Sequence, residues 1–204
     1  MILIGTHVDH PAATAYFVIL EKTLKNVRHY YDVKDARQSA APDCRDMMAA
    51  FYNDNAYTIR KRIYSQDRRP RKDVSARPTL VMAAGRREDL PLIEALRCMD
   101  VPVEAVFIKA DDCPPDPARA GIGKNHAATE KMIYETLTLV QAQARLAPLT
   151  GAENPLLENL SRMMATPGQN GPLLLAAAAP VWFRENVKYS SAYRTSATSI
   201  RKYR

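Results

Sequence analysis

The stretch that most constrains the fold is residues 78–109, with the sequence PTLVMAAGRREDLPLIEALRCMDVPVEAVFIK. Residues 79–83 and 103–108 are short apolar runs of the kind found in buried β-strands. Between them, an apolar pattern with helical spacing follows Pro91. A strand, a helix and a strand within about thirty residues form a right-handed crossover, which requires a parallel sheet covered by helices. The chain is therefore predicted to be an α/β protein.

Three further strands are predicted before this crossover, at residues 2–8, 14–20 and 26–33. The links between them are too short for crossovers, so neighbouring strands should form antiparallel hairpins. The whole sheet is then mixed, with three antiparallel strands followed by two parallel ones. Open sheets of this class place their chemistry at the C-terminal ends of the parallel strands. Residues 82–85 hold such a position and read Met-Ala-Ala-Gly, an unexpected set for a catalytic edge.

Helices are predicted around this sheet from apolar residues at helical spacing. The first begins at residues 41–43, where Pro and Asp make a favourable helix start, and a second helical stretch is predicted over residues 57–63. Three more are predicted at residues 124–146, 154–164 and 173–183. The last of these is almost wholly apolar, so we expect it to be buried.

Length and composition are those of one globular domain with appendages, since the chain has 204 residues of which 25% are charged. Three cysteines without a close pair argue against a disulfide framework and favour a reducing cytoplasm. The first ten residues lack the basic segment of a secretory signal. The longest apolar run, residues 173–183, is too short to span a bilayer. We therefore expect a cytoplasmic protein with no membrane partner.

Positive charge is concentrated in two places in this chain of net charge +7. A connector at residues 60–77 has eight Arg or Lys against two Asp, and a tail at residues 184–204 has six against one Glu. The tail lacks a pattern that can build a core, so we expect a domain over residues 1–183 and a flexible tail after it. Such clusters suit a polyanionic partner, although a solubilising linker and tail is the alternative. The predicted nucleic-acid-binding residues are Arg68, Arg69, Arg71, Lys72, Lys188, Arg194, Arg201, Lys202 and Arg204.

Four segments, in order, resemble the nuclease domain of phage terminase large subunits, which cut concatemeric DNA during head packaging. They are ILIGTHVDHPAATAYFVIL at residues 2–20, the crossover at 80–109, LTLVQAQARL at 137–146 and GPLLLAAAAPVWF at 171–183. The resemblance implies an RNase H-like fold: a mixed sheet in the order 3-2-1-4-5, flanked by helices. It also implies a setting in a phage or prophage packaging complex, in the cytoplasm of the host cell, with packaging or assembly proteins as partners.

The resemblance implies catalytic carboxylates at positions that this sequence fills differently. Nucleases of that family hold two Mg²⁺ or Mn²⁺ ions, whose natural ligands are carboxylates. By position, these carboxylates fall at His7 (or its neighbour Thr6), at Met82, and at Gly171 (or Pro172). A thioether has little affinity for Mg²⁺, and glycine has no side-chain ligand. The resemblance therefore implies a scaffold that has lost its metal cage, with no cofactor.

The leading hypothesis is a catalytically degenerate, RNase H-like protein that binds nucleic acid, with DNA the expected kind, or has a structural role. One alternative is an active Mg²⁺- or Mn²⁺-dependent nuclease with displaced carboxylates, for which the candidates are Asp9, Asp46, Asp111 and Asp112. Another is a protein-interaction or assembly module. His7, Asp9 and His10 also form an H-x-D-H cluster, which we interpret as polar residues that close a hairpin.

Overall fold

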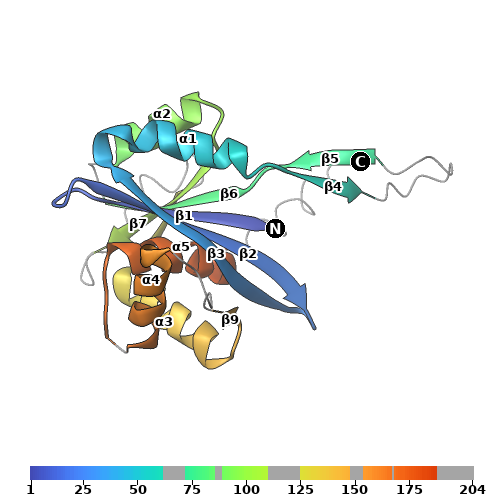
Figure 1. The fold of residues 1–204 in the computed structure, drawn as a ribbon, viewed down its shortest axis with the longest axis vertical. Coiled ribbons are helices and arrows are strands. Elements are labelled where there is room, and N and C mark those ends of the chain that lie inside the picture. Colours follow the sequence, from blue (N-terminus) through green and yellow to red (C-terminus); the bar gives the residue numbers. More distant parts are fainter. Residues whose placement is uncertain (62–71, 86–88, 110–124, 148–153, 167, 188–204) are drawn as a thin grey trace, which may run out of the picture.

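The fold is built on one seven-stranded mixed sheet with the strand order β8-β7-β6-β1-β2-β3-β9 (Figure 1). The computed structural model describes residues 1–61, 72–85, 89–109, 125–147, 154–166 and 168–187. The strands are β1 Ile2–Asp9, β2 Thr14–Lys25, β3 Arg28–Ala40, β6 Thr79–Ala84, β7 Val103–Lys109, β8 Asn125–Thr129 and β9 Leu146–Ala147. Strands β1, β2 and β3 are antiparallel, whereas β6, β7 and β8 run parallel to β1 and to one another. The predicted mixed α/β class is therefore correct.

The predicted order of five strands, 3-2-1-4-5, is wrong for the sheet as a whole, because the sheet continues at both edges. Strand β8 pairs with β7, and the two-residue strand β9 pairs with β3. Both strands are short and lie beside helical sequence. The prediction of one helix over residues 124–146 therefore included β8 and the first residue of β9. The helix that forms there, α3 Glu130–Ala142, is shorter. It begins after Thr129, whose hydroxyl caps it by accepting a hydrogen bond from the amide of Met132 at 3.2 Å.

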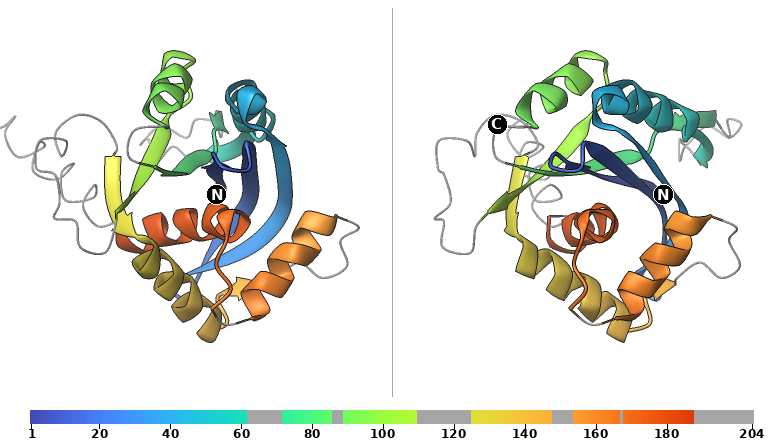
Figure 2. Two further views of the ribbon diagram at one scale, coloured as in Figure 1. Left: turned by 90° about the vertical axis from the view of Figure 1, so that its left-hand side faces the viewer. Right: turned by 60° about the vertical axis from the view of Figure 1, so that its left-hand side comes forward.

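Helices cover the two faces of the sheet (Figures 1 and 2). On one face lie α1 Cys44–Asp54, which follows a 3₁₀ turn at Ala41–Asp43, and α2 Leu90–Cys98. On the other face lie α3 Glu130–Ala142, α4 Pro155–Ala165 and α5 Pro172–Asn186. Strand β6, helix α2 and strand β7 form the predicted parallel crossover. Each face has its own apolar core, so the sheet is buried on both sides.

Helix α5 lies between the sheet and the outer helices, as Figure 2 shows. The run Leu173 to Trp182 is buried throughout, which is the expected place for a helix that is apolar on all sides. Gly5 of β1 permits the close contact, because an added Cβ would lie 1.9 Å from the carbonyl oxygen of Ala176. The helix also continues beyond Phe183, the last residue of the expected domain, to Asn186.

Two further strands form a separate antiparallel pair that extends away from the body in Figure 1. They are β4 Tyr57–Lys61 and β5 Lys72–Ala76, which we call the β4–β5 ribbon, and the residues that connect them, 62–71, lie outside the described part of the chain. The helix predicted through Tyr57, Ile59 and Ile63 is wrong over the described residues, since Tyr57 and Ile59 lie in β4. Aromatic and β-branched residues suit a strand, and the partner strand lies too far along the sequence for a local pattern to reveal it. Ile63 lies outside the described residues.

Candidate functional site

The C-terminal ends of β1 and β6 form the edge at which a sheet of this class places its chemistry. In the parallel register, Thr6 lies beside Met82 and His7 beside Ala83. Because successive residues of a strand face opposite sides, these two pairs point to opposite faces of the sheet. Met82 belongs to the core under α1 and α2, whereas Ala83 belongs to the core under α5. His7 and Met82 therefore lie on neighbouring strands but face away from each other.

Each of the three predicted degenerate positions has a structural contact of its own. Met82 is 0% exposed, so its thioether fills the apolar core. The Nδ1 atom of His7 lies 2.8 Å from the carbonyl oxygen of Ala83, to which it donates when it carries the proton. Gly171 is the N-cap of α5, and its carbonyl accepts a hydrogen bond from the hydroxyl of Tyr134 at 3.4 Å. These contacts tie β1 to β6 and α3 to α5.

An aspartate that the sequence reasoning did not select lies at the same edge. Asp89 precedes α2, is 1% exposed, and accepts a hydrogen bond from the backbone amide of Gly85 at the end of β6. Its Oδ1 atom lies 2.8 Å from Nε2 of His10, which follows the end of β1. A buried carboxylate that holds a partly exposed histidine fixes the orientation and tautomer of the imidazole. We call these two residues the His10–Asp89 pair.

Cys44, at the start of α1, is buried and its thiol is held in the neutral form. Burial raises the pKa of Cys44, and the negative charge of Asp89 raises it further. A thiol with a raised pKa is a poor nucleophile, so Cys44 serves as apolar packing at the start of α1.

The sequence around Asp89 resembles an ordinary helix start, and only the three-dimensional position of His10 distinguishes it.

Of the predicted fallback carboxylates, Asp9 and Asp46 lie in the described residues, and neither is grouped with the His10–Asp89 pair into a metal site. Asp9 accepts a hydrogen bond from the amide of Ala12 at 3.4 Å. Asp46 is exposed and accepts one from Nε of Arg45 at 2.8 Å, and this contact lowers its pKa. Asp111 and Asp112 lie outside the described residues. Within the described ranges, no three His, Cys, Asp or Glu side chains are grouped so that they could hold a metal ion.

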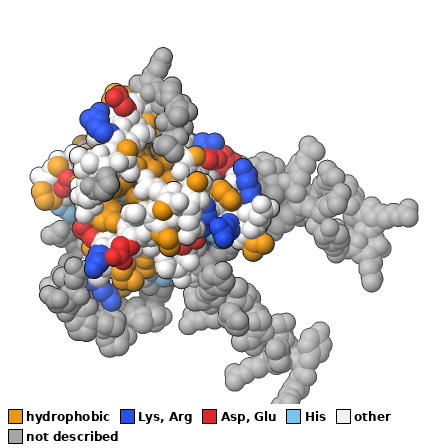
Figure 3. All heavy atoms as spheres, turned by 90° about the horizontal axis from the view of Figure 1, so that it is seen from below, with side chains coloured by type: hydrophobic (Ala, Val, Ile, Leu, Met, Phe, Trp, Pro, Cys, Tyr) orange, Lys and Arg blue, Asp and Glu red, His pale blue; other side chains and the backbone are white. Residues whose placement is uncertain are grey.

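The predicted nucleic-acid-binding residues lie almost wholly outside the described part of the chain. These are Arg68, Arg69, Arg71, Lys188, Arg194, Arg201, Lys202 and Arg204. Lys72 begins β5, where its backbone pairs with that of Lys61. Charged residues on the face seen in Figure 3, by contrast, are of both signs and interspersed. The basic residues of β4 and β5 belong to an element that extends away from the body in Figure 1.

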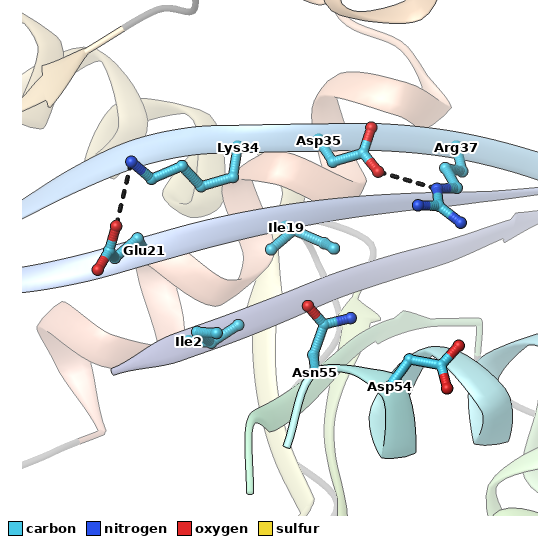
Figure 4. A pocket seen from close by; sticks show the side chains of 8 residues that line it. All are labelled: Ile2, Ile19, Glu21, Lys34, Asp35, Arg37, Asp54 and Asn55. Carbon is cyan, nitrogen blue, oxygen red and sulfur yellow. Dashed lines mark hydrogen bonds and ion pairs between the residues drawn. The ribbon is translucent and has the colours of Figure 1, made fainter. Parts of the chain in front are cut away.

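A pocket of about 460 Å³ lies where β1, β2, β3 and the end of α1 meet (Figure 4). Its lining includes Glu21, which pairs with Lys34 at 3.1 Å, and Asp35, which pairs with Arg37 at 2.8 Å. Figure 4 shows the first pair joining β2 to β3 and the second pair along β3, with Asp54 on the helix opposite. Three acidic and two basic side chains line this space, so its charge does not favour a phosphate.

A buried polar cluster fixes the C-terminal end of α5 to the far edge of the sheet. Glu185 accepts hydrogen bonds from the hydroxyl of Tyr31 at 2.6 Å and from Nη1 of Arg145 at 3.1 Å. His29 lies 3.4 Å from the same carboxylate. Burial first, and then the hydrogen bond to Glu185, raise the pKa of Tyr31. The cluster is a structural tie, and it shows that residues just beyond position 183 belong to the packed body.

Comparison of the chain with models of protein families, with curated proteins and with solved structures found no match in any of the three. No helix within the described residues has both the length and the apolar character needed to cross a lipid bilayer.

Proposed function

We propose that this chain is a nucleic-acid-binding protein on a degenerate RNase H-like scaffold, and that it grips its partner with the β4–β5 ribbon. The observation that carries the proposal is a projecting antiparallel ribbon within a segment of strong positive charge. Residues 60–77 cover the last two residues of β4, the connection and all of β5, with eight Arg or Lys and two Asp. A two-stranded ribbon fits the major groove of duplex DNA, and its cations would pair with phosphates.

The position of Met82 supports a binding role without cleavage. A metal-dependent nuclease needs carboxylates at the ends of the central strands, and Met82 is packed in the apolar core with Thr6 beside it. Restoring a metal ligand there would place a charge in that core at a large free-energy cost. The resemblance to terminase nuclease domains suggests duplex DNA as the partner and a phage packaging complex as the setting.

The test is the salt dependence of binding to a fluorescently labelled DNA duplex, followed by anisotropy. If the chain neutralises Z phosphates, the logarithm of the affinity should fall with the logarithm of the salt concentration at a slope of about −0.9Z. Replacing Arg68, Arg69 and Arg71 together with Gln should weaken binding and reduce that slope by about 2 to 3.

A matched control removes the same charge from the body. Arg45, Lys131 and Arg162 are exposed on helices and each lies in an ion pair, so replacing them with Gln should leave both stability and binding nearly unchanged. Equal weakening by the two triple variants would show that binding follows net charge alone and would refute the ribbon as the binding element. Absence of binding at low salt would refute the nucleic-acid proposal itself.

The His10–Asp89 pair favours a second candidate function, a metal-dependent nuclease with a displaced site. Asp89 is a buried carboxylate at the catalytic edge, with an imidazole 2.8 Å away, so these two residues could supply ligands that Thr6 and Met82 cannot. Plasmid DNA incubated with the protein and Mg²⁺ or Mn²⁺ decides between the candidates. Cutting that Asp89→Asn abolishes and Asp46→Asn leaves intact would establish the nuclease. Intact plasmid at all metal concentrations favours the binding protein.

A further inference from the structure

The β2–β3 hairpin ends in a turn that is unusual in both sequence and conformation. Lys25 pairs with Arg28, so the turn itself contains only Asn26 and Val27. Their φ angles are 48° and 65°, which are the values of a two-residue turn with both residues left-handed. Asparagine tolerates this conformation, but the following position normally holds glycine. A β-branched residue there is a genuine outlier, and such outliers are a reason to look for a function.

The side chain held in this conformation is almost fully exposed. Val27 is 93% exposed, and Leu24 on the same tip is 65% exposed. A valine that neither packs nor suits its backbone contributes nothing evident to the stability of the fold. The presence of valine at this position is therefore better explained by contact with a partner than by a role in folding.

The charge around the tip indicates what kind of partner fits. Residues 22–31 contain three Lys or Arg and no Asp or Glu. Lys25 and Arg28 are both exposed, and Nζ of Lys25 lies 5.7 Å from the centre of the Tyr30 ring. Two apolar side chains flanked by exposed cations match a polyanion that also offers an apolar surface. A nucleic acid does so, since its bases stack between two lines of phosphates.

We propose that this tip is a second nucleic-acid contact, in which Leu24 and Val27 press against bases while Lys25 and Arg28 pair with phosphates. The inference rests on the proposed function, because it assigns a second element to the same ligand. In Figure 1 the β2–β3 tip and the β4–β5 ribbon extend from the body toward the same side. The pocket of Figure 4, lined by Glu21 and Lys34 of the hairpin and by Asp54 and Asn55 just before β4, lies between their bases.

The decisive variant is Val27→Gly, because glycine adopts the left-handed conformation freely and the fold should be kept. Combined with Leu24→Ser, it should weaken binding to a labelled DNA duplex about tenfold, the order of magnitude for losing one base contact. The slope of affinity against salt should stay the same, since no charge is removed. Lys25→Gln with Arg28→Gln should instead reduce that slope by about 2.

Leu139→Ser is the matched control, because Leu139 is 55% exposed on α3. It should leave DNA affinity unchanged. If the wild-type protein binds DNA and the Arg68, Arg69 and Arg71 variant weakens it, but Val27→Gly with Leu24→Ser does not, this inference is wrong and the proposed function stands. If wild-type protein fails to bind DNA at low salt, the proposed function and this inference fall together. Binding to vesicles of anionic phospholipid that Val27→Gly with Leu24→Ser weakens, with DNA affinity unchanged, would assign the tip to a lipid surface and overturn the inference.

Discussion

At the scale of single residues, Gly5 shows how close the central helix lies to the sheet. A Cβ at this position would lie 1.9 Å from the carbonyl oxygen of Ala176, and 2.8 Å from Cγ of Pro180. The first of these is backbone and cannot rotate away, so either β1 or α5 would have to shift. The absence of a side chain at Gly5 is therefore a requirement of the packing between them.

We expect Gly5→Ala to destabilise the fold by about 3 kcal/mol or more, because overpacking against backbone has no cheap relaxation. Gly85→Ala is the control, since a Cβ there would meet its nearest atom, Oδ2 of Asp89, at an ordinary 3.4 Å. It should cost less than about 1 kcal/mol. Urea denaturation followed by circular dichroism measures both, and a Gly5→Ala protein as stable as Gly85→Ala would contradict the packing described for β1 and α5.

Replacing the turn residue Val27 with glycine should have the opposite effect on stability from Gly5→Ala. The φ of 65° at Val27 costs a β-branched residue about 1–2 kcal/mol, whereas glycine loses about 0.5–1 kcal/mol through the greater freedom of the unfolded chain. Val27→Gly should therefore raise the free energy of unfolding by about 0.5–1 kcal/mol. Thermal and urea denaturation test this, with Val27→Ala as the comparison that keeps most of the strain. A less stable Val27→Gly protein would mean that the turn adopts another conformation.

At the scale of elements, the cluster around Glu185 connects the end of α5 to β3 and to the residue before β9. Glu185 lies beyond Phe183, at which sequence patterns predicted the domain to stop, yet it receives hydrogen bonds from Tyr31 of β3 and from Arg145 before β9. Removing residues 188–204 should leave the melting temperature unchanged, because these contacts remain. Removing residues 184–204 should lower it by several degrees, because the buried side chains of Tyr31 and Arg145 lose their hydrogen-bond partner. Equal melting temperatures for the two truncated proteins would show that the cluster contributes little.

The same cluster predicts a dependence of stability on pH. Burial would raise the pKa of Glu185, but the hydrogen bonds from Tyr31 and Arg145 outweigh it and lower that pKa. The folded protein therefore binds this proton less readily than the unfolded chain does. The carboxylate stabilises the fold above the ordinary pKa of glutamate, and its contribution is lost as the pH falls below about 4 through the lower folded value.

Glu185→Gln should cost about 1–3 kcal/mol at pH 7, because Arg145 is buried and loses its counter-charge. The difference from wild type should shrink at about pH 3, below the ordinary pKa of glutamate, because there the unfolded chain gains the proton that the native carboxylate binds less readily. Urea denaturation at the two pH values measures this. Glu135→Gln, in an exposed pair with Lys131, should change little at either pH. A cost for Glu185→Gln that is the same at both pH values would contradict the lowered pKa.

Elements whose residues form a local pattern could be predicted from the sequence, and the others could not. The crossover of β6, α2 and β7 has apolar runs and helical spacing within 31 residues, and it is present as predicted. Strand β4 was assigned to a helix because its partner β5 begins 11 residues after it ends, beyond the reach of periodicity. Strand β9 has two residues and no pattern of its own. Its pairing with β3 depends on the tertiary structure alone.

The candidate site also could not be predicted from a local sequence pattern. His10 and Asp89 are 79 positions apart, and the H-x-D-H cluster that contains His10 gives no hint of Asp89, so only the alignment of β1 with β6 brings them within 2.8 Å. By position, the resemblance placed the lost carboxylates at His7, or its neighbour Thr6, and at Met82. It did not reveal that the pleat turns His7 away from Met82 and leaves Thr6 on the same side as Met82, since that depends on the register between the strands.

At the scale of the whole molecule, the β4–β5 ribbon and the β2–β3 tip together predict how affinity depends on the length of a DNA ligand. If the β4–β5 ribbon and the β2–β3 tip contact one duplex, the second contact forms at a high effective concentration once the duplex is long enough to reach both. A series from about 8 to about 32 base pairs covers lengths of about 27 to 109 Å at 3.4 Å per base pair. Affinity of the wild-type protein should rise steeply within this range and then level off.

The variants identify which element makes the second contact. Protein carrying Val27→Gly with Leu24→Ser, and protein with Arg68, Arg69 and Arg71 replaced by Gln, should each lose the steep rise and keep weak binding at every length. The Leu139→Ser protein should follow the wild type, because its substitution lies on α3 and in neither of these two elements. Anisotropy at fixed salt measures every curve. A gradual rise that is parallel in all four proteins would reflect only the growing number of sites on longer DNA, and it would exclude a duplex held by both ribbons at once.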